Sequence, residues 1–438
     1  MTGVATAGLA LHQREEDLEG ARIEPKQVPS ALRLFWADGL FAAAQDAFIL
    51  AYLPLLATEL GAGGAEIGLL ASSQSLGGVL ALYPGAMAAR RARSRRWLVV
   101  LFAGLLGRFA LLASAFAVAL ASGNTALYLV IGLFALRAFL GNFTLPAWTS
   151  LAADIIPPGA RSRYFASRNV AINLATLAIT PLGGLLLDWM GMPGGYVVAL
   201  AVSFGLGMCA TFVYSRLPEP PRAPAAERAG KRFRPLAAAR DRHFRTFLAA
   251  TFVLQFATMI AGPFFNVYLK NDLGASNFEV GLLSTAAAFA GMIGQLYFGD
   301  VMARRGALWL TRAALVTMPV LPLMWLGISN PWLVLAPNML GGFIWSAFNL
   351  ANFQLLLEVT HEENREEFVA IFHTGVFFAL FLAPFLGGVV VDTMGYKAAF
   401  ALSGGGRIVA AVMFFVAMRE PAKEAARGMI LRRAETEA

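Results

Sequence analysis

The sequence predicts an all-α membrane protein in which twelve transmembrane helices form two six-helix bundles. Three observations predict this fold class. Of 438 residues, 58% are hydrophobic and only 14% are charged, whereas a soluble domain carries roughly 25% charged residues. The chain also contains twelve long apolar runs, and motifs of its first half recur in the same order in its second half. A surface with so little charge is expected to face lipid.

Each apolar run is long enough to cross a bilayer, which takes about 20 mostly apolar residues in a helix. Most connections between the runs are short, so consecutive helices are expected to be neighbours. The runs cover residues 34–57, 67–89, 97–121, 126–153, 165–187, 195–215, 246–269, 280–302, 307–328, 331–357, 368–391 and 397–418.

One connection is long, and it divides the runs into six and six. It contains Pro218, Pro220, Pro221 and Pro224 together with many charges, a composition typical of a solvated loop. The predicted organisation is an N-terminal tail at 1–33, a bundle at 34–215, a linker at 216–245, a second bundle at 246–418 and a C-terminal tail at 419–438.

Positive charge lies almost entirely on one side of the predicted bundles. Of the 35 Lys and Arg residues, only Lys270 and Lys397 fall on the side opposite the linker, and the residues placed within the membrane are Arg108, Arg137, Arg312 and Arg407. Cytoplasmic loops carry such an excess, so we expect an inner or plasma membrane protein with both termini in the cytoplasm. The same distribution explains the net charge of +8 without nucleic acid, because anionic lipid lies on that side.

The clearest repeat ends the second apolar run of each half. Residues 82–91 read LYPGAMAARR, and residues 296–305 read LYFGDVMARR. Two further pairs match, namely LGA…EIGLL at 60–70 with LGA…EVGLL at 273–283, and GGLLLDWMG at 183–191 with GGVVVDTMG at 387–395. Helices repeated in the same order form a parallel repeat, which is typical of transporters whose two halves move about a site between them.

The first of these repeats resembles the hallmark of the major facilitator superfamily, which is a glycine, three residues, an acid and then basic residues. Gly85 and Gly299 match the glycine, and Arg90 and Arg304 match the first basic residue. The resemblance covers nearly all of 34–419. It implies two bundles that alternate access to a central cavity lined by helices one, four, seven and ten.

Several positions depart from the family's patterns. Ala89 and Ala303 stand where the hallmark has its acid, which in the family latches the cytoplasmic ends of the two halves. The helix-four pattern Arg-x-x-Gln-Gly is matched by 137–141 with Leu140 in place of glutamine. The antiporter pattern of helix five, Gly-Pro-x-x-Gly-Gly, is matched by 180–184 with one residue fewer.

Two loops are candidates to replace the weakened latch. The loop 161–169, which contains Arg161, is basic, and its repeat counterpart 361–367, which contains Arg365, is acidic. We predict that these loops meet across the halves and stabilise the outward-facing state. Two separately solvated loops are the alternative.

Charge in the middle of a bilayer costs a few kcal/mol and therefore marks function. Asp46 lies roughly 20 Å into the first run at 1.5 Å per residue, and Arg137 lies near the middle of the fourth. The resemblance implies that both helices face the cavity, so the two residues can pair. We predict that Asp46 carries the coupled proton and that Arg137 keeps it ionised when it is unoccupied. A static buried ion pair is the alternative.

Asp38 and three arginines also lie inside the bounds of the runs. Arg108 and Arg407 are in helices three and twelve, which the resemblance makes peripheral, and we expect structural roles for both. Arg312 and Asp38 are near the cytoplasmic ends of their runs, where a side chain can snorkel to water. Asp38 is nevertheless a second candidate for coupling.

Polar residues form stripes along single faces of helices four, seven and ten. Amides are costly against lipid, so they need partners or a wet cavity. The stripes predict a substrate cavity of amide side chains and tryptophan faces, with interhelical hydrogen bonding as the alternative. The predicted cavity residues are Gln45, Trp148, Asn173, Gln255, Asn266, Trp345, Asn349 and Asn352.

The expected function is proton-coupled secondary transport of a small organic solute by alternating access. The chain has no Gly-x4-Gly-Lys-Ser/Thr loop for ATP, a single cysteine and no metal-ligand spacing, so no cofactor, metal or nucleic acid is expected. The expected partners are the solute, protons and the lipid bilayer, with the protein acting as a monomer.

Two directions of transport stay open. Efflux of amphipathic compounds, lipophilic cations in particular, is favoured by 34 Phe, 15 Met and a single buried acid with aromatic walls. Uptake of sugars or polyols is favoured by the amide and tryptophan stripes. A lipid-modifying membrane enzyme is an alternative of another class, but the short outer loops carry no cluster of catalytic residues, so no enzyme is expected.

Overall fold

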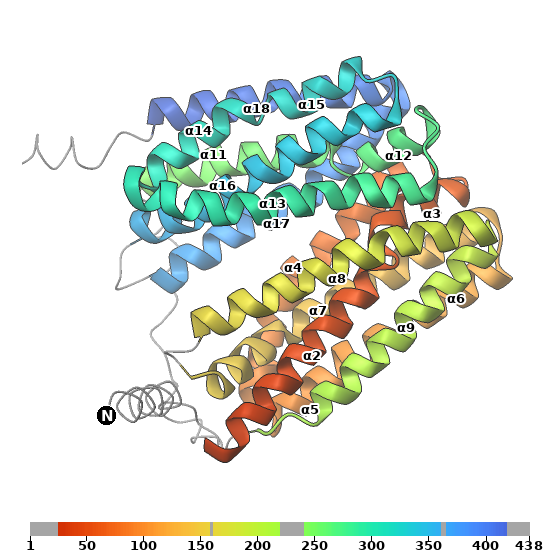
Figure 1. Ribbon diagram of the computed structural model, residues 1–438, viewed down its shortest axis with the longest axis vertical. Coiled ribbons are helices and arrows are strands. Elements are labelled where there is room, and N and C mark those ends of the chain that lie inside the picture. The colour runs from red at the N-terminus through yellow and green to blue at the C-terminus, as the bar shows by residue number, and fades with distance from the viewer. Residues whose placement is uncertain (1–24, 158–160, 220–240, 361–364, 418–438) are drawn as a thin grey trace, which may run out of the picture. The chain divides into compact units, whose positions relative to one another are not determined.

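The computed structural model describes residues 25–157, 161–219, 241–360 and 365–417 (Figure 1). Within these ranges all regular structure is helical. Twelve of the described helical segments are long and apolar enough to cross a membrane, which confirms the predicted fold class.

Six spans lie in the first half of the chain, and two of them are interrupted. The first consists of α2 (Val28–Ala47) and α3 (Leu53–Glu59), and the third consists of α5 (Arg95–Val99), the π-helix η3 (Val100–Leu106) and α6 (Gly107–Leu120). The others are α4 (Gly64–Arg91), α7 (Gly123–Ile155), α8 (Arg161–Met190) and α9 (Gly194–Ser215).

The second half has the same order of spans. The seventh span of the chain consists of α11 (Arg242–Ala261) and α12 (Phe264–Asn271), and the ninth contains α14 (Ala307–Thr317) and α15 (Val320–Met324). The others are α13 (Asn277–Arg305), α16 (Leu335–Val359), α17 (Arg365–Met394) and α18 (Tyr396–Ala417).

The repeated motifs build the same local structures in both halves. The glutamate of each repeat accepts a hydrogen bond from the backbone N–H three residues earlier, at 3.0 Å for Glu66 and 2.9 Å for Glu279. This bond satisfies an N–H that the first turn of a helix leaves unpaired. Just before these turns, Gly61 and Gly274 have φ angles of 92° and 72°, which glycine adopts without strain.

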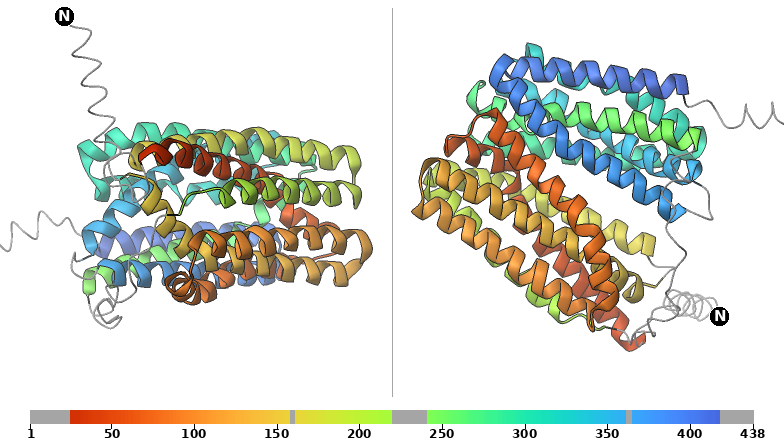
Figure 2. Two further views of the ribbon diagram at one scale, coloured as in Figure 1. Left: turned by 90° about the horizontal axis from the view of Figure 1, so that it is seen from below. Right: turned by 180° about the vertical axis from the view of Figure 1, so that it is seen from behind.

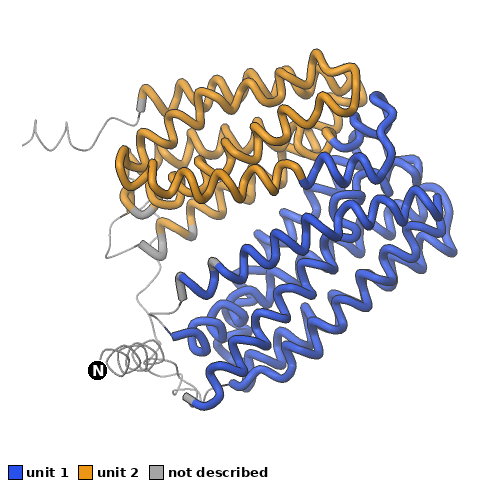
Figure 3. The backbone as a smooth tube through the Cα atoms, in the orientation of Figure 1, with its two compact units in different colours: residues 1–231, 266–285 blue, residues 232–265, 286–438 orange. Residues whose placement is uncertain are grey.

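The chain divides into two compact units (Figure 3). Unit 1 comprises residues 1–231 and 266–285, and unit 2 comprises 232–265 and 286–438. Hydrogen bonds explain why the segment 266–285 belongs to unit 1. Asn266 Nδ2 donates to the carbonyl of Ala51 at 3.2 Å. Asp188 of α8 accepts from the backbone N–H groups of Asn277 and Phe278, at 2.9 and 2.8 Å, and so caps the start of α13.

Glycine sets the packing of α4 along α7 in unit 1 (Figure 2, right). A Cβ at Gly85 would collide with the backbone carbonyl of Phe143, and a Cβ at Gly77 would lie 2.9 Å from the backbone nitrogen of Phe139. The repeat counterpart of Gly85 is Gly299 on α13, where a Cβ would have no atom within 4 Å. The same motif therefore serves close packing in unit 1 and an open surface in unit 2.

Each unit has its own apolar core. In unit 1 the core includes Val28, Phe35, Leu151, Ile155 and Tyr214. In unit 2 it includes Phe244, Phe247, Phe348, Phe372 and Phe414. The first of these cores supports the polar pocket described next.

Candidate functional site

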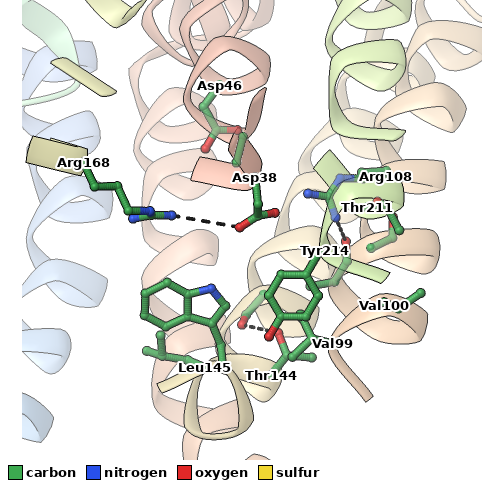
Figure 4. A pocket seen from close by; sticks show the side chains of 15 residues that line it. Asp38, Asp46, Val99, Val100, Arg108, Thr144, Leu145, Arg168, Thr211 and Tyr214 are labelled. Atoms are coloured by element: carbon green, nitrogen blue, oxygen red, sulfur yellow. Dashed lines mark hydrogen bonds and ion pairs between the residues drawn. The ribbon is translucent and has the colours of Figure 1, made fainter. Parts of the chain in front are cut away.

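A pocket of about 440 Å³ lies inside unit 1 (Figure 4). It is surrounded by α2, the interrupted third span, α7, α8 and α9. Apolar side chains such as Val99 and Leu145 form part of its wall, together with the ring of Trp148. The polar and charged side chains that line it are Asp38, Asp46, Arg108, Thr144, Arg168, Thr211 and Tyr214.

Asp46 pairs with Arg137, as the sequence predicted. Nη2 of Arg137 donates to Oδ1 of Asp46, and Nε2 of Gln45 donates to the same oxygen at 2.9 Å. The side chain of Asp46 is 42% exposed and that of Arg137 is 20% exposed, so the carboxylate is the more accessible partner. The predicted contact is confirmed, while the role of the pair in proton coupling stays a prediction.

Asp38 lies about two helical turns before Asp46 on the same face of α2. Its residue is only 7% exposed, and its Oδ2 is 4.0 Å from Nη2 of Arg168. The Arg168 guanidinium also lies over the rings of Phe35 and Trp148, at 5.3 and 5.6 Å from their centroids. The expectation that Asp38 snorkels to water is wrong, because Arg168 supplies a counter-ion inside the unit.

Arg108 lines the same pocket, so the prediction that it is peripheral is wrong (Figure 4). Its Nη1 donates to the carbonyl of Ala103 at 3.1 Å, and its Nε is buried without a hydrogen-bond partner among the described residues. Gly207 of α9 leaves room for it, since a Cβ there would lie 2.8 Å from Nε. The π-helix just before Arg108 changes the direction of the residues that follow, and such distortions are frequent at functional sites.

One signal in the sequence points to part of this cluster. Asp38, Ala42 and Asp46 all line the pocket, and their spacing of four residues places both acids on one helical face. This spacing could have identified Asp38 as a pocket residue. The directions of Arg108 and Arg168 depend on a π-helix and on the rotation of α8, and no local pattern encodes either.

The other predicted cavity residues of the first seven spans lie in different surroundings. Asn173 and Gln255 are half-buried. The amide of Asn266 bonds to the Ala51 carbonyl, and its Oδ1 accepts from the hydroxyl of Ser284 at 3.3 Å. These contacts match the alternative of interhelical hydrogen bonding for Asn266.

The predicted cavity residues of α16 lie in unit 2. Trp345 packs edge-to-face on Phe348 with ring centroids 5.6 Å apart. Asn349 is exposed, and Asn352 is half-buried. The Oδ1 of Asn352 has no hydrogen-bond partner among the described residues. A role in substrate binding stays a prediction for all three positions.

The basic residues of the loop motifs lie at helix ends. Arg90 and Arg304 are exposed near the ends of α4 and α13. Arg161 and Arg365 begin α8 and α17, but their side chains and the loop 361–364 lie outside the described residues. The predicted meeting of the basic and acidic loops therefore stays a prediction.

The structure shows a charge cluster around Arg95 that the sequence did not reveal. Nη2 of Arg95 is 2.7 Å from Oδ2 of Asp154, and Nη1 donates to Ser150 at 2.6 Å. The backbone N–H of Arg95 donates to Glu219 at 2.6 Å, and the Ser94 hydroxyl donates to the same carboxylate. The cluster joins the start of α5 to α7 and to the chain that follows α9.

Arg95→Ala is expected to destabilise unit 1 by about 2 kcal/mol, because it leaves two carboxylates without their shared cation. The loss stays moderate because the side chains of Asp154 and Glu219 are 13% and 17% exposed and keep some hydration. Thermal unfolding in detergent measures it. Arg93→Ala is the matched control, since Arg93 is exposed in the same loop. Equal melting temperatures for the two variants would contradict the prediction.

In unit 2, Arg407 is 3% exposed, and its Nη1 donates to the carbonyl of Met318 at 3.0 Å. This bond ties α18 to the end of α14, which agrees with the structural role expected for this residue. The guanidinium of Arg312 lies 5.5 Å from the ring centroid of Phe415.

Solved structures share the fold of this chain. The nucleoside transporter NupG matches with a TM-score of 0.70 and 14% identity, covering 89% of this chain and 99% of NupG. The D-xylose–proton symporter matches with a TM-score of 0.70 and 14% identity, covering 89% of this chain and 97% of the symporter. At such identities the likeness concerns the fold alone.

Sequence comparison finds a distant relative and a family. The relative is the multi-drug resistance efflux pump PmrA homolog of Lactococcus lactis subsp. lactis (strain IL1403). It is 22% identical over 376 residues, which cover 84% of this chain and 90% of that protein. The family model of the Major Facilitator Superfamily matches residues 35–256 and 247–434. The chain therefore belongs to the Major Facilitator Superfamily, and it is a multi-pass secondary transporter of small molecules and not an enzyme.

Proposed function

We propose that this transporter exports amphipathic organic compounds in exchange for protons. It acts as a monomer in the inner or plasma membrane, with both tails and the linker 216–245 in the cytoplasm. Bundles 34–215 and 246–418 alternate access to the solute. The asymmetry of Lys and Arg between the two sides supports this orientation.

The observation that carries the proposal is the ion pair between Asp46 and Arg137 beside the pocket. A carboxylate that is 42% exposed can exchange a proton with the water of the pocket. Protonation of Asp46 removes the charge that holds Arg137, so the pair breaks and the guanidinium is free to move. Binding and release of a proton thereby change the contacts between α2 and α7, which is a differential interaction that can bias a conformational equilibrium.

The pocket wall supports an amphipathic solute. Val99, Leu145 and the ring of Trp148 offer an apolar surface next to the charged groups. The distant relative is described as a multi-drug resistance efflux pump, which supports export over uptake. Sugar uptake, the other direction predicted from the sequence, has no such support.

Flux into proteoliposomes tests the proposal. With an acidic lumen, outward flow of protons is expected to drive the accumulation of fluorescent amphiphiles, for which cationic rhodamine 6G and anionic dansylglycine serve as probes. A protonophore should abolish the accumulation. The proposal would be contradicted if the protonophore left the accumulation of either dye unchanged. It would also be contradicted if D-xylose were taken up in a proton-driven manner while neither dye was transported.

A further inference from the structure

Five charged groups lie in or beside the pocket of unit 1, and three of them are positive. Arg108, Arg168, Asp38 and Asp46 line the pocket, and the guanidinium of Arg137 pairs with Asp46 without lining the pocket itself. Both carboxylates already have a guanidinium partner, since Asp46 pairs with Arg137 and Asp38 pairs with Arg168. Arg108 is the guanidinium of the three that stands outside both pairs.

Arg108 interacts with Asp38 and Asp46 at longer range but contacts neither carboxylate. Its Nη1 donates to a neutral carbonyl, that of Ala103, and its Nε is buried without a partner in the described ranges. Within those ranges no carboxylate lies within 4.0 Å of its guanidinium nitrogens. A buried cation that has no counter-ion in contact is costly, so an anion that reaches it gains more than it would from an ion pair in water.

Tyr214 adds a second unused donor. The residue is 3% exposed, and its hydroxyl has no hydrogen-bond partner among the described residues. Arg108 and Tyr214 both lie on the side of the pocket away from Arg168 (Figure 4). A guanidinium and a phenol both donate hydrogen bonds to a carboxylate. This side of the pocket therefore offers two donor groups whose hydrogen-bonding capacity is not fully used.

The remaining wall fits the body of such a ligand. Ala42, Val100 and Leu145 are apolar, and Trp148 presents its ring. A small organic anion with an apolar body would place its carboxylate at Arg108 and its hydrocarbon part on these side chains. A lipophilic cation would instead meet an excess of positive charge, which disfavours it.

We propose that Arg108 and Tyr214 form an anion-binding subsite that selects amphipathic solutes carrying a carboxylate. The inference rests on the proposed function, because it names the substrate class of the same pocket. It replaces the expectation of lipophilic cations, which was based on the single buried acid Asp46 and did not include Arg108, Arg168 or Asp38 in the pocket.

Three probes with one carbon skeleton test the charge preference, namely 3-phenylpropanoate, 3-phenylpropylammonium and 3-phenylpropanamide. Each is titrated calorimetrically into the full-length protein in nanodiscs of neutral lipid. The carboxylate is expected to bind at least about tenfold more tightly than the ammonium. Arg108→Gln should remove this preference, and Tyr214→Phe should weaken carboxylate binding by about threefold or more.

Two further variants keep the result interpretable. Arg108→Lys retains the charge but not the planar fork, so it should bind the carboxylate more weakly than the wild type and still prefer it to the ammonium. If Arg108→Gln does not fold, the carboxylate affinity of Arg108→Lys tests whether the Arg108 guanidinium binds the anion. Arg312→Gln removes a guanidinium outside the pocket and should leave all three affinities unchanged.

Two outcomes would overturn the anion subsite. One is ammonium binding as tight as carboxylate binding in the wild type. The other is an unchanged carboxylate affinity in folded Arg108→Lys and Tyr214→Phe. The titration involves no pH gradient, so a lost charge preference with intact proton-driven flux refutes this inference alone. Lost proton dependence with an intact preference refutes the proposed coupling alone.

Discussion

Asp46→Asn is expected to abolish proton-driven accumulation of solute while the protein still folds and binds its substrate. Asparagine has nearly the same shape and keeps an oxygen that can accept from Gln45 and Arg137, as Asp46 does now. It cannot carry an exchangeable proton or a negative charge, so the contact with Arg137 no longer depends on the proton gradient. Accumulation in proteoliposomes with an acidic lumen should fall to the level of protein-free vesicles.

Solute exchange without a pH gradient separates loss of coupling from loss of transport. Asp46→Asn should still exchange labelled for unlabelled solute, because that reaction needs no net proton movement. Glu59→Gln is the matched control, since Glu59 is an exposed acid at the end of the same span. Wild-type accumulation by Asp46→Asn would show that the coupling group lies elsewhere, and Asp38 is then the next acid to replace.

Gly85→Ala and Gly299→Ala are expected to have effects of opposite sign, although the two glycines occupy equivalent positions in the repeat. A Cβ at position 85 would collide with the backbone of Phe143, which cannot rotate away as a side chain can. The helices α4 and α7 would have to separate, at a cost of about 3 kcal/mol. At position 299 the added methyl enters open space, and alanine stabilises a helix interior by about 0.5–1 kcal/mol relative to glycine.

Thermal unfolding of the purified variants checks this pair. Gly85→Ala should lower the melting temperature or the yield of folded protein, and Gly299→Ala should leave both at or slightly above the wild-type values. Gly77→Ala offers a second test of the same interface, since its Cβ would lie 2.9 Å from the backbone of Phe139. Equal effects at positions 85 and 299 would mean that α4 and α7 are not in close contact.

The membrane topology and the repeat could be predicted from the sequence because both depend on local properties. Partition of a helix into lipid depends on the composition of about 20 consecutive residues, so each of the twelve spans can be predicted from its own residues. Capping glutamates such as Glu66 and Glu279, and left-handed glycines such as Gly61 and Gly274, act within a single turn. The contact between Asp46 and Arg137 was also predictable, but only because the resemblance to a known family implied that both helices face one cavity.

The composition of the pocket was decided by tertiary structure. Arg108 turns inward after a π-helical segment, and Arg168 reaches Asp38 from α8, so the charge balance of the site depends on helix rotation and on contacts distant in sequence. The environments of Gly85 and Gly299 could not be predicted from the sequence either, because Gly85 is packed against α7 while Gly299, at the same position of the repeat, has open space around it. The sequence by itself determined the fold class and the repeat, whereas the Asp46–Arg137 pair needed the family resemblance as well. Only the tertiary structure decided that Arg108 and Arg168 share the pocket, because the direction of a side chain across a bundle depends on the packing of its neighbours and not on the residues beside it in the chain.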